Sequence, residues 1–130
     1  MTTLARKYGF TKSQLDSIVN KAFDLVDAGE VEGATVVLEG LTVLDPTNAR
    51  FLAAFGAVLQ HQGKVEEART AYEKALAMDS GSVLALVNRG ELRCLRGDLG
   101  GLDDLRAAAD LKSPVRTKAE ALLRRFGAVS

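Results

Sequence analysis

Few side chains in this sequence are suited to chemistry, and they stand far apart. His61 is the sole histidine and Cys94 the sole cysteine, so neither has a partner of its own kind for a metal ion. No histidine stands at a spacing from Cys94 that would suggest a nucleophile and its base. The glycine-rich stretch GDLGG at 97–101 lacks the lysine of a phosphate-binding loop. We therefore expect no catalysis, no metal ion and no other cofactor.

Composition and charge exclude further classes of function. The 130 residues include 17 basic and 17 acidic side chains, whereas a protein that binds nucleic acid needs a basic excess or a basic face. No apolar run approaches the ~20 residues of a membrane span, and none follows the basic residues of the N-terminus as in a signal peptide. We expect one cytoplasmic domain that binds protein or peptide, without nucleic acid and without insertion into a membrane.

The elements that must position these side chains recur with a fixed period. Gly29, Gly63 and Gly97 stand 34 residues apart. The same step relates further sets of similar residues: Ile18, Leu52 and Leu86; Ala22, Gly56 and Gly90; Val31, Val65 and Leu99. A period of this length is typical of solenoid proteins. The sequence predicts three copies, over 15–48, 49–82 and 83–116.

Each copy reads as two helices. In the middle copy, ARFLAAFGAVLQHQ and VEEARTAYEKALAMD both carry apolar residues at helical spacing, and Gly63 between them is suited to end the first helix. Gly56 and Ala68 would let the two helices approach closely. One hairpin cannot cover its own apolar face, so the copies must stack on one another. The predicted fold is therefore an all-α solenoid.

The two ends of the solenoid have their own signals. Thr11 and Gln14 form a capping box that would start the first helix near Lys12. Near the C-terminus, Ser113 and Pro114 would start a last helix and Gly127 would end it. This helix would cover the exposed side of the third copy. We predict about seven helices, arranged as an N-terminal segment (1–11), a single domain (12–126) whose capping helix spans 114–126, and a tail (127–130).

The period and the residue classes resemble the tetratricopeptide repeat (TPR). The middle copy has the family's signature positions: Leu52, Phe55, Gly56, Leu59, Gly63, Ala68, Tyr72 and Ala75. In that family the first helix of each pair lines a concave groove that binds peptides. By repeat phase, the resemblance implies a groove made of Asp16, Val19, Phe23, Val26 and Asp27; Arg50, Ala53, Ala57, Gln60 and His61; and Leu84, Val87, Glu91, Cys94 and Leu95.

The character of this predicted groove suggests its ligand. Much of the set is apolar or small, which suits an extended aliphatic peptide, while Arg50 and the acidic residues would fix its direction. Family members that bind a terminal carboxylate use a clamp of Lys, Arg and Asn, but Val19 and Phe23 stand at the matching places here. An alternative is that the groove is filled by the N-terminal segment 1–10 or by a second copy of the chain.

A narrower resemblance covers the second and third copies. The stretch ARFLAAFGAVLQHQGKVEEARTAYEKALAMD, with GELRCLRGDL after it, is similar to the class II (translocator) chaperones of type III secretion. Those proteins have three repeats and a C-terminal helix, and they hold translocators before export. The resemblance implies a cytoplasmic chaperone that holds an aliphatic segment of a client protein, and it allows a homodimer. The alternative function is a TPR scaffold or adaptor that joins folded proteins.

The third copy carries arginines where the repeat expects apolar residues. Arg89, Arg93 and Arg106 cannot be buried without partners. One hypothesis is that they extend to solvent or pair with nearby acids, namely Asp103, Asp104, Asp110 or Glu120. The other is that Arg89 and Arg93 form a cationic lip that binds an acidic segment of a partner.

Overall fold

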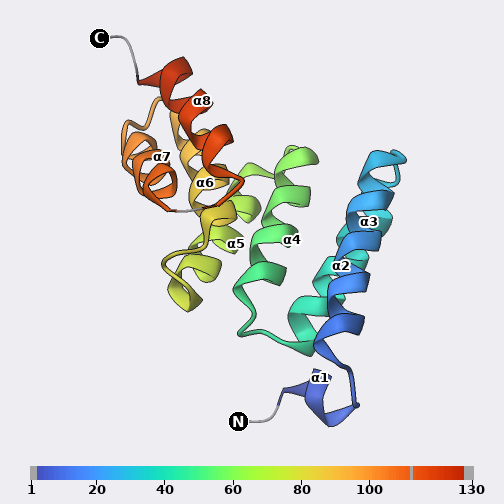
Figure 1. Ribbon diagram of the computed structural model, residues 1–130. Coiled ribbons are helices and arrows are strands. Elements are labelled where there is room, and N and C mark those ends of the chain that lie inside the picture. The colour runs from blue at the N-terminus through green and yellow to red at the C-terminus, as the bar shows by residue number, and fades with distance from the viewer. Residues whose placement is uncertain (1–2, 112, 128–130) are drawn as a thin grey trace.

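The computed structural model describes residues 3–111 and 113–127, and this part of the chain folds into helices without any β-strand. After the short α1 (Leu4–Lys7), six helices form three antiparallel hairpins that stack side by side (Figure 1). They pair as α2 (Lys12–Asp27) with α3 (Val31–Leu44), α4 (Ala49–His61) with α5 (Val65–Met78), and α6 (Val83–Leu95) with α7 (Gly100–Asp110). With α8 (Arg116–Phe126) these make the predicted all-α solenoid, to which α1 adds an eighth helix.

A glycine turns the chain between the two helices of every hairpin. Gly29, Gly63 and Gly97 have φ angles of +83°, +79° and +79°. Residues other than glycine rarely adopt this left-handed backbone conformation. The 34-residue spacing of these glycines therefore reflects a backbone requirement that each hairpin repeats.

Glycines also allow the helices of a hairpin to approach closely. A Cβ atom at Gly56 in α4 would lie 2.6 Å from the ring of Tyr72 in α5. In the third hairpin, a Cβ at Gly90 would lie 2.8 Å from Leu105 Cγ, and one at Gly101 would lie 2.5 Å from the carbonyl oxygen of Gly90. The sequence predicted this role for Gly56 but not for Gly101, which lies inside α7. The third hairpin is thus the one whose two backbones meet most directly through glycine.

The apolar core runs through the stack because α4 contributes side chains to the core clusters of the first and the second hairpin. Phe51 and Ala54 are buried in the core cluster of the first hairpin, while Leu52 and Leu59 are buried in that of the second. A helix buried on nearly all sides is apolar nearly all round. The run ARFLAAFGAVL satisfies this condition, so α4 is the central helix of the solenoid.

The last helix covers the third hairpin, as predicted. Ala119 and Leu122 of α8 are buried in one cluster with Val87 and Leu105. The start of the helix was predicted wrongly at Pro114, since α8 begins at Arg116, after a turn in which the Ser113 hydroxyl accepts from the Val115 N–H at 3.3 Å.

Gly127 ends α8, as predicted, and the packing of the helix explains why a glycine stands there. Gly127 has a φ of −120°, and a Cβ atom there would lie 2.7 Å from Leu102 Cδ2. The glycine is therefore required by the close approach of a side chain from α7 and not by a left-handed turn. The rest of the predicted tail, 128–130, lies outside the described residues.

The N-terminal residues form the base of the first hairpin. The predicted capping box starts α2 at Lys12: the Thr11 hydroxyl accepts from the Gln14 N–H at 3.1 Å, and Gln14 Oε1 accepts from the Thr11 N–H at 2.9 Å. In α1, Ala5 is buried against the first core cluster. Figure 1 shows α1 at one end of the stack. The described part of segment 1–10 therefore does not run along the face formed by α2, α4 and α6, as the plug hypothesis required.

Candidate functional site: the concave face of α2, α4 and α6

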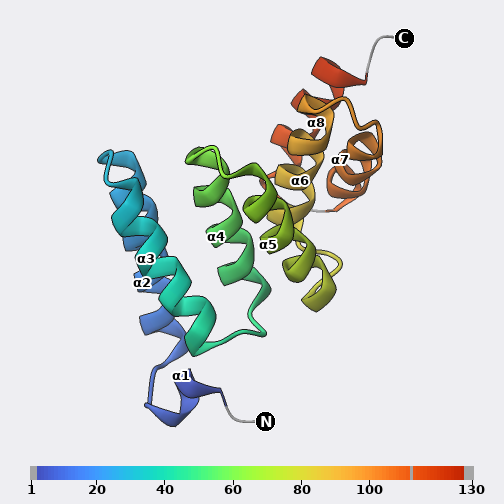
Figure 2. The ribbon, with the colours of Figure 1, turned by 180° about the vertical axis from the view of Figure 1, so that it is seen from behind.

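The first helices of the three hairpins form one face of the molecule. In Figure 1, α2, α4 and α6 follow one another across the view, and Figure 2 shows α3 and α5 in front of them when the molecule is seen from behind. We refer to the surface of α2, α4 and α6 that faces away from α3, α5 and α7 as the concave face. It is the surface on which the TPR resemblance places the peptide site.

Three residues predicted to line this face lie in the core instead. Val19, Ala53 and Val87 have no exposed surface, and each belongs to one of the three core clusters. They stand 34 residues apart, so the same helical direction is buried in every hairpin. Because a client could not reach these side chains in the folded protein, their assignment to the groove was wrong. Val26 lies seven residues after Val19 and on the same side of α2, and it is partly buried against the same core cluster.

Cys94 was also assigned to the groove, but its side chain points toward α7. A Cβ atom at Gly101 would lie 2.8 Å from Cys94 Sγ, which places the thiol between the two helices of the third hairpin. Burial raises the pKa of the Cys94 thiol, and the charges of Asp104 and Asp98 raise it further. An activated cysteine has a lowered pKa, so this thiol has the character of a packing residue.

The arginines of the third hairpin are held by an acid of α7. Arg89 donates to both carboxylate oxygens of Asp104, from Nε at 2.9 Å and from a terminal nitrogen at 2.7 Å. Arg93 donates to Asp104 at 3.2 Å and lies 3.3 Å from Asp98. Asp104 is only 6 % exposed. The pairing hypothesis is therefore correct and the cationic lip is not formed, because Asp104 takes up both guanidinium groups.

Arg106, the third arginine, also pairs with a nearby acidic residue, but at the surface. Arg106 lies 3.3 Å from Asp103, one turn away on α7, and both side chains are largely exposed.

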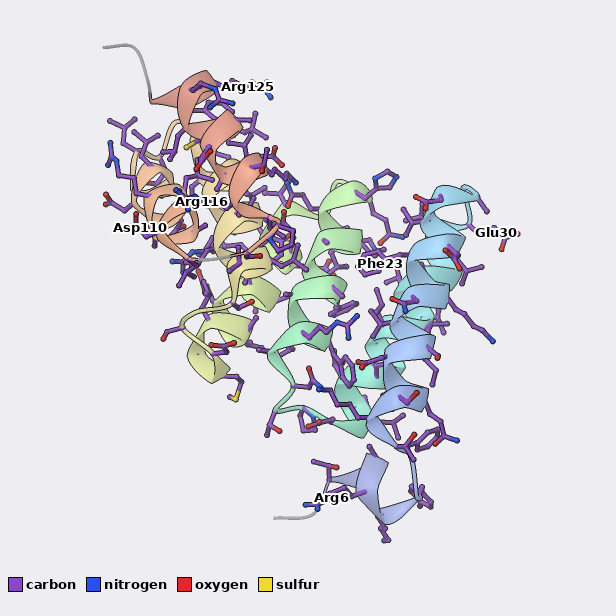
Figure 3. All side chains as sticks on the ribbon, in the orientation of Figure 1. Arg6, Phe23, Glu30, Asp110, Arg116 and Arg125 are labelled. Atoms are coloured by element: carbon purple, nitrogen blue, oxygen red, sulfur yellow. The ribbon has the colours of Figure 1, made fainter. Side chains whose placement is uncertain are left out.

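The apolar part of the concave face is made by α2 and α6. Phe23 is partly exposed, and Figure 3 shows it on the side of α2 that faces α4. On α6, Leu84 is partly exposed and Leu95 is 56 % exposed. Between them α4 presents the small Ala57, with the exposed His61 at its end, while Asp27 is exposed at the end of α2. The face therefore has bulky apolar side chains on both flanks, on α2 and α6, and a small side chain between them on α4.

Two polar pairs cross this face from one hairpin to the next. Arg50 of α4 lies 2.5 Å from Asp16 of α2, and Gln60 of α4 lies 3.4 Å from Glu91 of α6. The Tyr72 hydroxyl donates to Gln60 Oε1 at 2.7 Å, so the amide nitrogen of Gln60 is the atom turned to Glu91. The ring of Tyr72 is fully buried, and this burial raises the pKa of its hydroxyl, with a further contribution from the charge of Glu91. These pairs place oriented amide and carboxylate groups among the apolar side chains.

Two asparagines of the face were missed by the sequence analysis. Asn20 and Asn88 each follow a buried valine, and they share a helical face with Asp16 and Phe23, and with Leu84 and Glu91, respectively. Asn20 is exposed, whereas Asn88 is buried and accepts from Lys118 of α8 at 3.4 Å, so only Asn20 is accessible on the face. A spacing of four residues from Asp16 and from Leu84, one helical turn, would have found both.

The concave face continues into a cavity at the N-terminal end of the stack. This cavity of about 810 Å³ is lined by α1 and by the first turns of α2 and α4. It shares Asp16 and Arg50 with the face and adds Arg6, Phe10 and Lys12. This cavity was not predicted from the sequence, because α1 was not predicted.

The described residues form neither a metal-binding cluster nor a membrane-spanning helix. Over 3–111 and 113–127 the structure brings together no group of three or more side chains that could hold a metal ion. Within the same ranges, no helix combines the length and the apolar character that a membrane span requires.

Comparison with known proteins gives structural relatives only. No protein-family model and no curated protein matches the sequence. The fold is similar to that of SycD, a type III secretion translocator chaperone of Yersinia enterocolitica, with a TM-score of 0.83 and 23 % identity over 96 % of this chain and 98 % of SycD. PcrH, solved in complex with the chaperone binding region of PopB, gives a TM-score of 0.71 and 28 % identity over 92 % of this chain and 97 % of PcrH.

A relative outside secretion has the same architecture. The first TPR of Spaghetti (RPAP3), bound to an HSP90 peptide, gives a TM-score of 0.79 with 18 % identity over 89 % of this chain and 94 % of that one. The resemblance to TPR proteins, and to translocator chaperones among them, is thus confirmed at the level of the fold.

Proposed function

We propose that this chain is a type III secretion chaperone that holds an extended aliphatic segment of a client, such as a translocator, on its concave face. The observation that carries the proposal is the accessible apolar surface of Phe23, Leu84 and Leu95 on that face. It occurs in a fold shared with SycD and with PcrH, whose structure holds a chaperone binding region. In this proposal the protein acts in the cytoplasm, before export.

The geometry supports an extended client. Its aliphatic side chains would cover Phe23 on one flank and Leu95 on the other, and full burial of such a side chain contributes about 1.5–3 kcal/mol. Ala57 is small enough to let the client backbone approach α4. Glu91 and Gln60 can then hydrogen-bond to backbone groups of the client, which would otherwise lose their hydrogen bonds to water.

This function depends on binding and not on catalysis. The raised pKa of the Cys94 thiol and its place between α6 and α7 support this part of the proposal. The position of His61, the sole histidine, also supports it, because this residue lies at the end of α4 without a second histidine.

The test is recovery of the client with wild type and with a matched pair of variants. Phe23→Asp combined with Leu95→Asp alters both apolar flanks of the concave face. Leu99→Asp is the control, because Leu99 is 73 % exposed and lies outside that face, before α7. Each protein is checked by circular dichroism and used in a pull-down from native cell extract, and overlapping peptides of the recovered protein are measured by fluorescence anisotropy.

We expect wild type and Leu99→Asp to recover a protein with long hydrophobic segments and to bind one aliphatic peptide of it. The double variant should bind this peptide at least tenfold more weakly. If the folded double variant keeps all partners and their affinities, the concave face is not the client site and the proposal fails.

The second candidate is a scaffold or adaptor that joins folded proteins. It is favoured by the exposure of Val36 and Val43 on α3, which lies away from the concave face. Recovery of soluble assembly partners whose binding is unchanged by Phe23→Asp and Leu95→Asp would support a scaffold function in place of the chaperone function.

A further inference from the structure

The 34-residue step of the sequence continues beyond the third copy into α8. It relates two sets of positions on the concave face: Asp16, Arg50, Leu84 and Lys118; and Phe23, Ala57, Glu91 and Arg125. The first three members of each set come from α2, α4 and α6, and the last comes from α8. By its phase, α8 is therefore the first helix of a fourth copy. Lys118 and Arg125 stand where the earlier copies contribute to the concave face.

The structure places these two side chains beside α6. Lys118 Nζ lies 3.4 Å from Asn88 Oδ1, at the contact between the two helices. Arg125 follows Lys118 by seven residues, two helical turns, and so lies on the same side of α8. In Figure 1, α6 and α8 run in the same direction, and Figure 3 shows Arg125 on the side of α8 that is turned away from α7. Both residues are exposed, so α8 extends the concave face beyond α6.

This extension of the concave face is cationic. The helix α8 carries four basic residues and a single acidic one, Glu120, in a chain with 17 side chains of each sign. Glu120 is paired with Arg116 at 2.7 Å. In the described part of the chain, no ion pair includes Lys118 or Arg125. The charges of Lys118 and Arg125 are therefore available to a ligand.

We infer that Lys118 and Arg125 bind acidic side chains of the client, beside its aliphatic segment. This inference rests on the proposed function and narrows the class of client. In the proposed function Leu84 and Leu95 of α6 contact the aliphatic segment, and α8 is the next helix along the face. Complementary charge at the edge of an apolar site contributes to specificity and fixes orientation. The preferred client is therefore an aliphatic segment with Asp or Glu on one side of it.

The spacing of the helices predicts where these acidic residues stand. Packed helices lie about 8–10 Å apart, and an extended chain advances about 3.3 Å per residue. An extended client that crosses the face therefore reaches α8 about three residues beyond the side chain that covers α6.

Selection from random peptides tests the inference without knowledge of the client. The purified full chain selects short peptides displayed on phage, each joined at its C-terminus to the coat protein, so that no terminal carboxylate can imitate an acidic side chain. Wild type should enrich peptides with Asp or Glu about three positions from an aliphatic residue. Lys118→Gln combined with Arg125→Gln should retain the aliphatic preference and lose the acidic one.

Fluorescence anisotropy with an enriched, C-terminally amidated peptide measures the effect. The double variant should bind three- to tenfold more weakly than wild type, because exposed ion pairs each contribute little. Replacing the acidic residues of the peptide by Asn or Gln should weaken binding to wild type by the same factor and leave binding to the double variant unchanged. Added salt should weaken binding to wild type more than binding to the double variant.

A matched control removes the same charge from the same helix. Arg116→Gln combined with Arg124→Gln should leave the affinity for the peptide unchanged. Arg116 is paired with Glu120, and Arg124 points about 100° away from its neighbour Arg125 around the helix. An equal loss in the two double variants would show a general attraction of α8 for negative charge and would overturn the inference.

The remaining outcomes separate the inference from the proposed function. Aliphatic peptides without an acidic preference, or an acidic preference that Lys118→Gln with Arg125→Gln retains, overturn the inference and leave the proposed function standing. If no aliphatic peptide is enriched, or if Phe23→Asp with Leu95→Asp leaves the enrichment unchanged, the proposed function fails and the inference fails with it. Binding of a DNA duplex through the two cations, without an acidic preference among peptides, would assign them to nucleic acid instead.

Discussion

Gly56 shows how one missing side chain sets the geometry of a hairpin. The ring of Tyr72 fills the space where a Cβ would stand, at 2.6 Å from its position. The repeat phase predicted a small residue here, since Ala22 and Gly90 stand at the same place in the other copies. It could not predict the partner ring, which depends on how α5 lies against α4.

Gly56→Ala should therefore lower the free energy of unfolding by roughly 1–2 kcal/mol. Overpacking costs about 1–3 kcal/mol, and the better helix propensity of alanine offsets part of it. Gly40→Ala is the matched control, because its Cβ has room, and it should raise the free energy of unfolding by about 0.5–1 kcal/mol. Urea unfolding at a few micromolar protein measures both, and equal effects in the two variants would contradict the close contact.

Tyr72 should make the stability of the protein depend on alkaline pH. Its pKa is raised above the ordinary value of 10.0 by burial. Above pH 10 the unfolded chain releases this proton while the folded chain retains it, so the free energy of unfolding falls as pH rises. Urea unfolding between pH 9 and 11 should show a steeper decline for wild type than for Tyr72→Phe. Tyr8→Phe, which alters an exposed tyrosine, should retain the decline of wild type.

Among the elements, α6 and α7 are joined by more than apolar packing. Their backbones meet at Gly90 and Gly101, and Asp104 of α7 receives Arg89 and Arg93 of α6. From the sequence, Asp104 was one of four candidate acidic partners. The choice among them depends on the close approach of the two helices at the glycines, which no spacing in the sequence shows.

Asp104→Asn should lower the free energy of unfolding by roughly 2–3 kcal/mol. Loss of one partner of a buried ion pair costs about 3–5 kcal/mol, and the partial exposure of both arginines reduces this cost. Asp103→Asn, one residue away, breaks only the exposed pair with Arg106 and should cost less than about 0.5 kcal/mol. Thermal unfolding of the two variants compares them directly. Similar losses would show that the buried cluster contributes no more than a surface pair.

The concave face shows the limit of reasoning from repeat phase. The period indicated the first helix of each hairpin, and these helices, α2, α4 and α6, follow one another along the stack. It assigned Val19 where the structure exposes Asn20, because neighbouring residues differ by 100° around a helix. The crossing angles between packed helices decide which of the two is covered, and they follow from side-chain packing along the whole contact.

At the scale of the whole molecule, the stack is closed at its C-terminal end by α8. Ala119→Glu would place a charge at a fully buried position and should lower the free energy of unfolding by more than 3 kcal/mol or prevent folding. Ala121→Glu, on the exposed side of the same helix, should be nearly neutral. Circular dichroism and binding of a hydrophobic dye distinguish the two. If Ala119→Glu were as stable as wild type, α8 would not be needed as a cap.

The chain of hydrogen bonds from Tyr72 to Gln60 and on to Glu91 gives the protein an optical signal of its own. There is no tryptophan, and of the two tyrosines Tyr8 is 68 % exposed whereas Tyr72 is buried. A client that takes Gln60 or Glu91 as its own hydrogen-bond partner changes the bond that the Tyr72 hydroxyl donates. Ultraviolet difference spectra in the tyrosine band would then follow occupancy of the concave face without any label, against a background from one solvent-exposed ring.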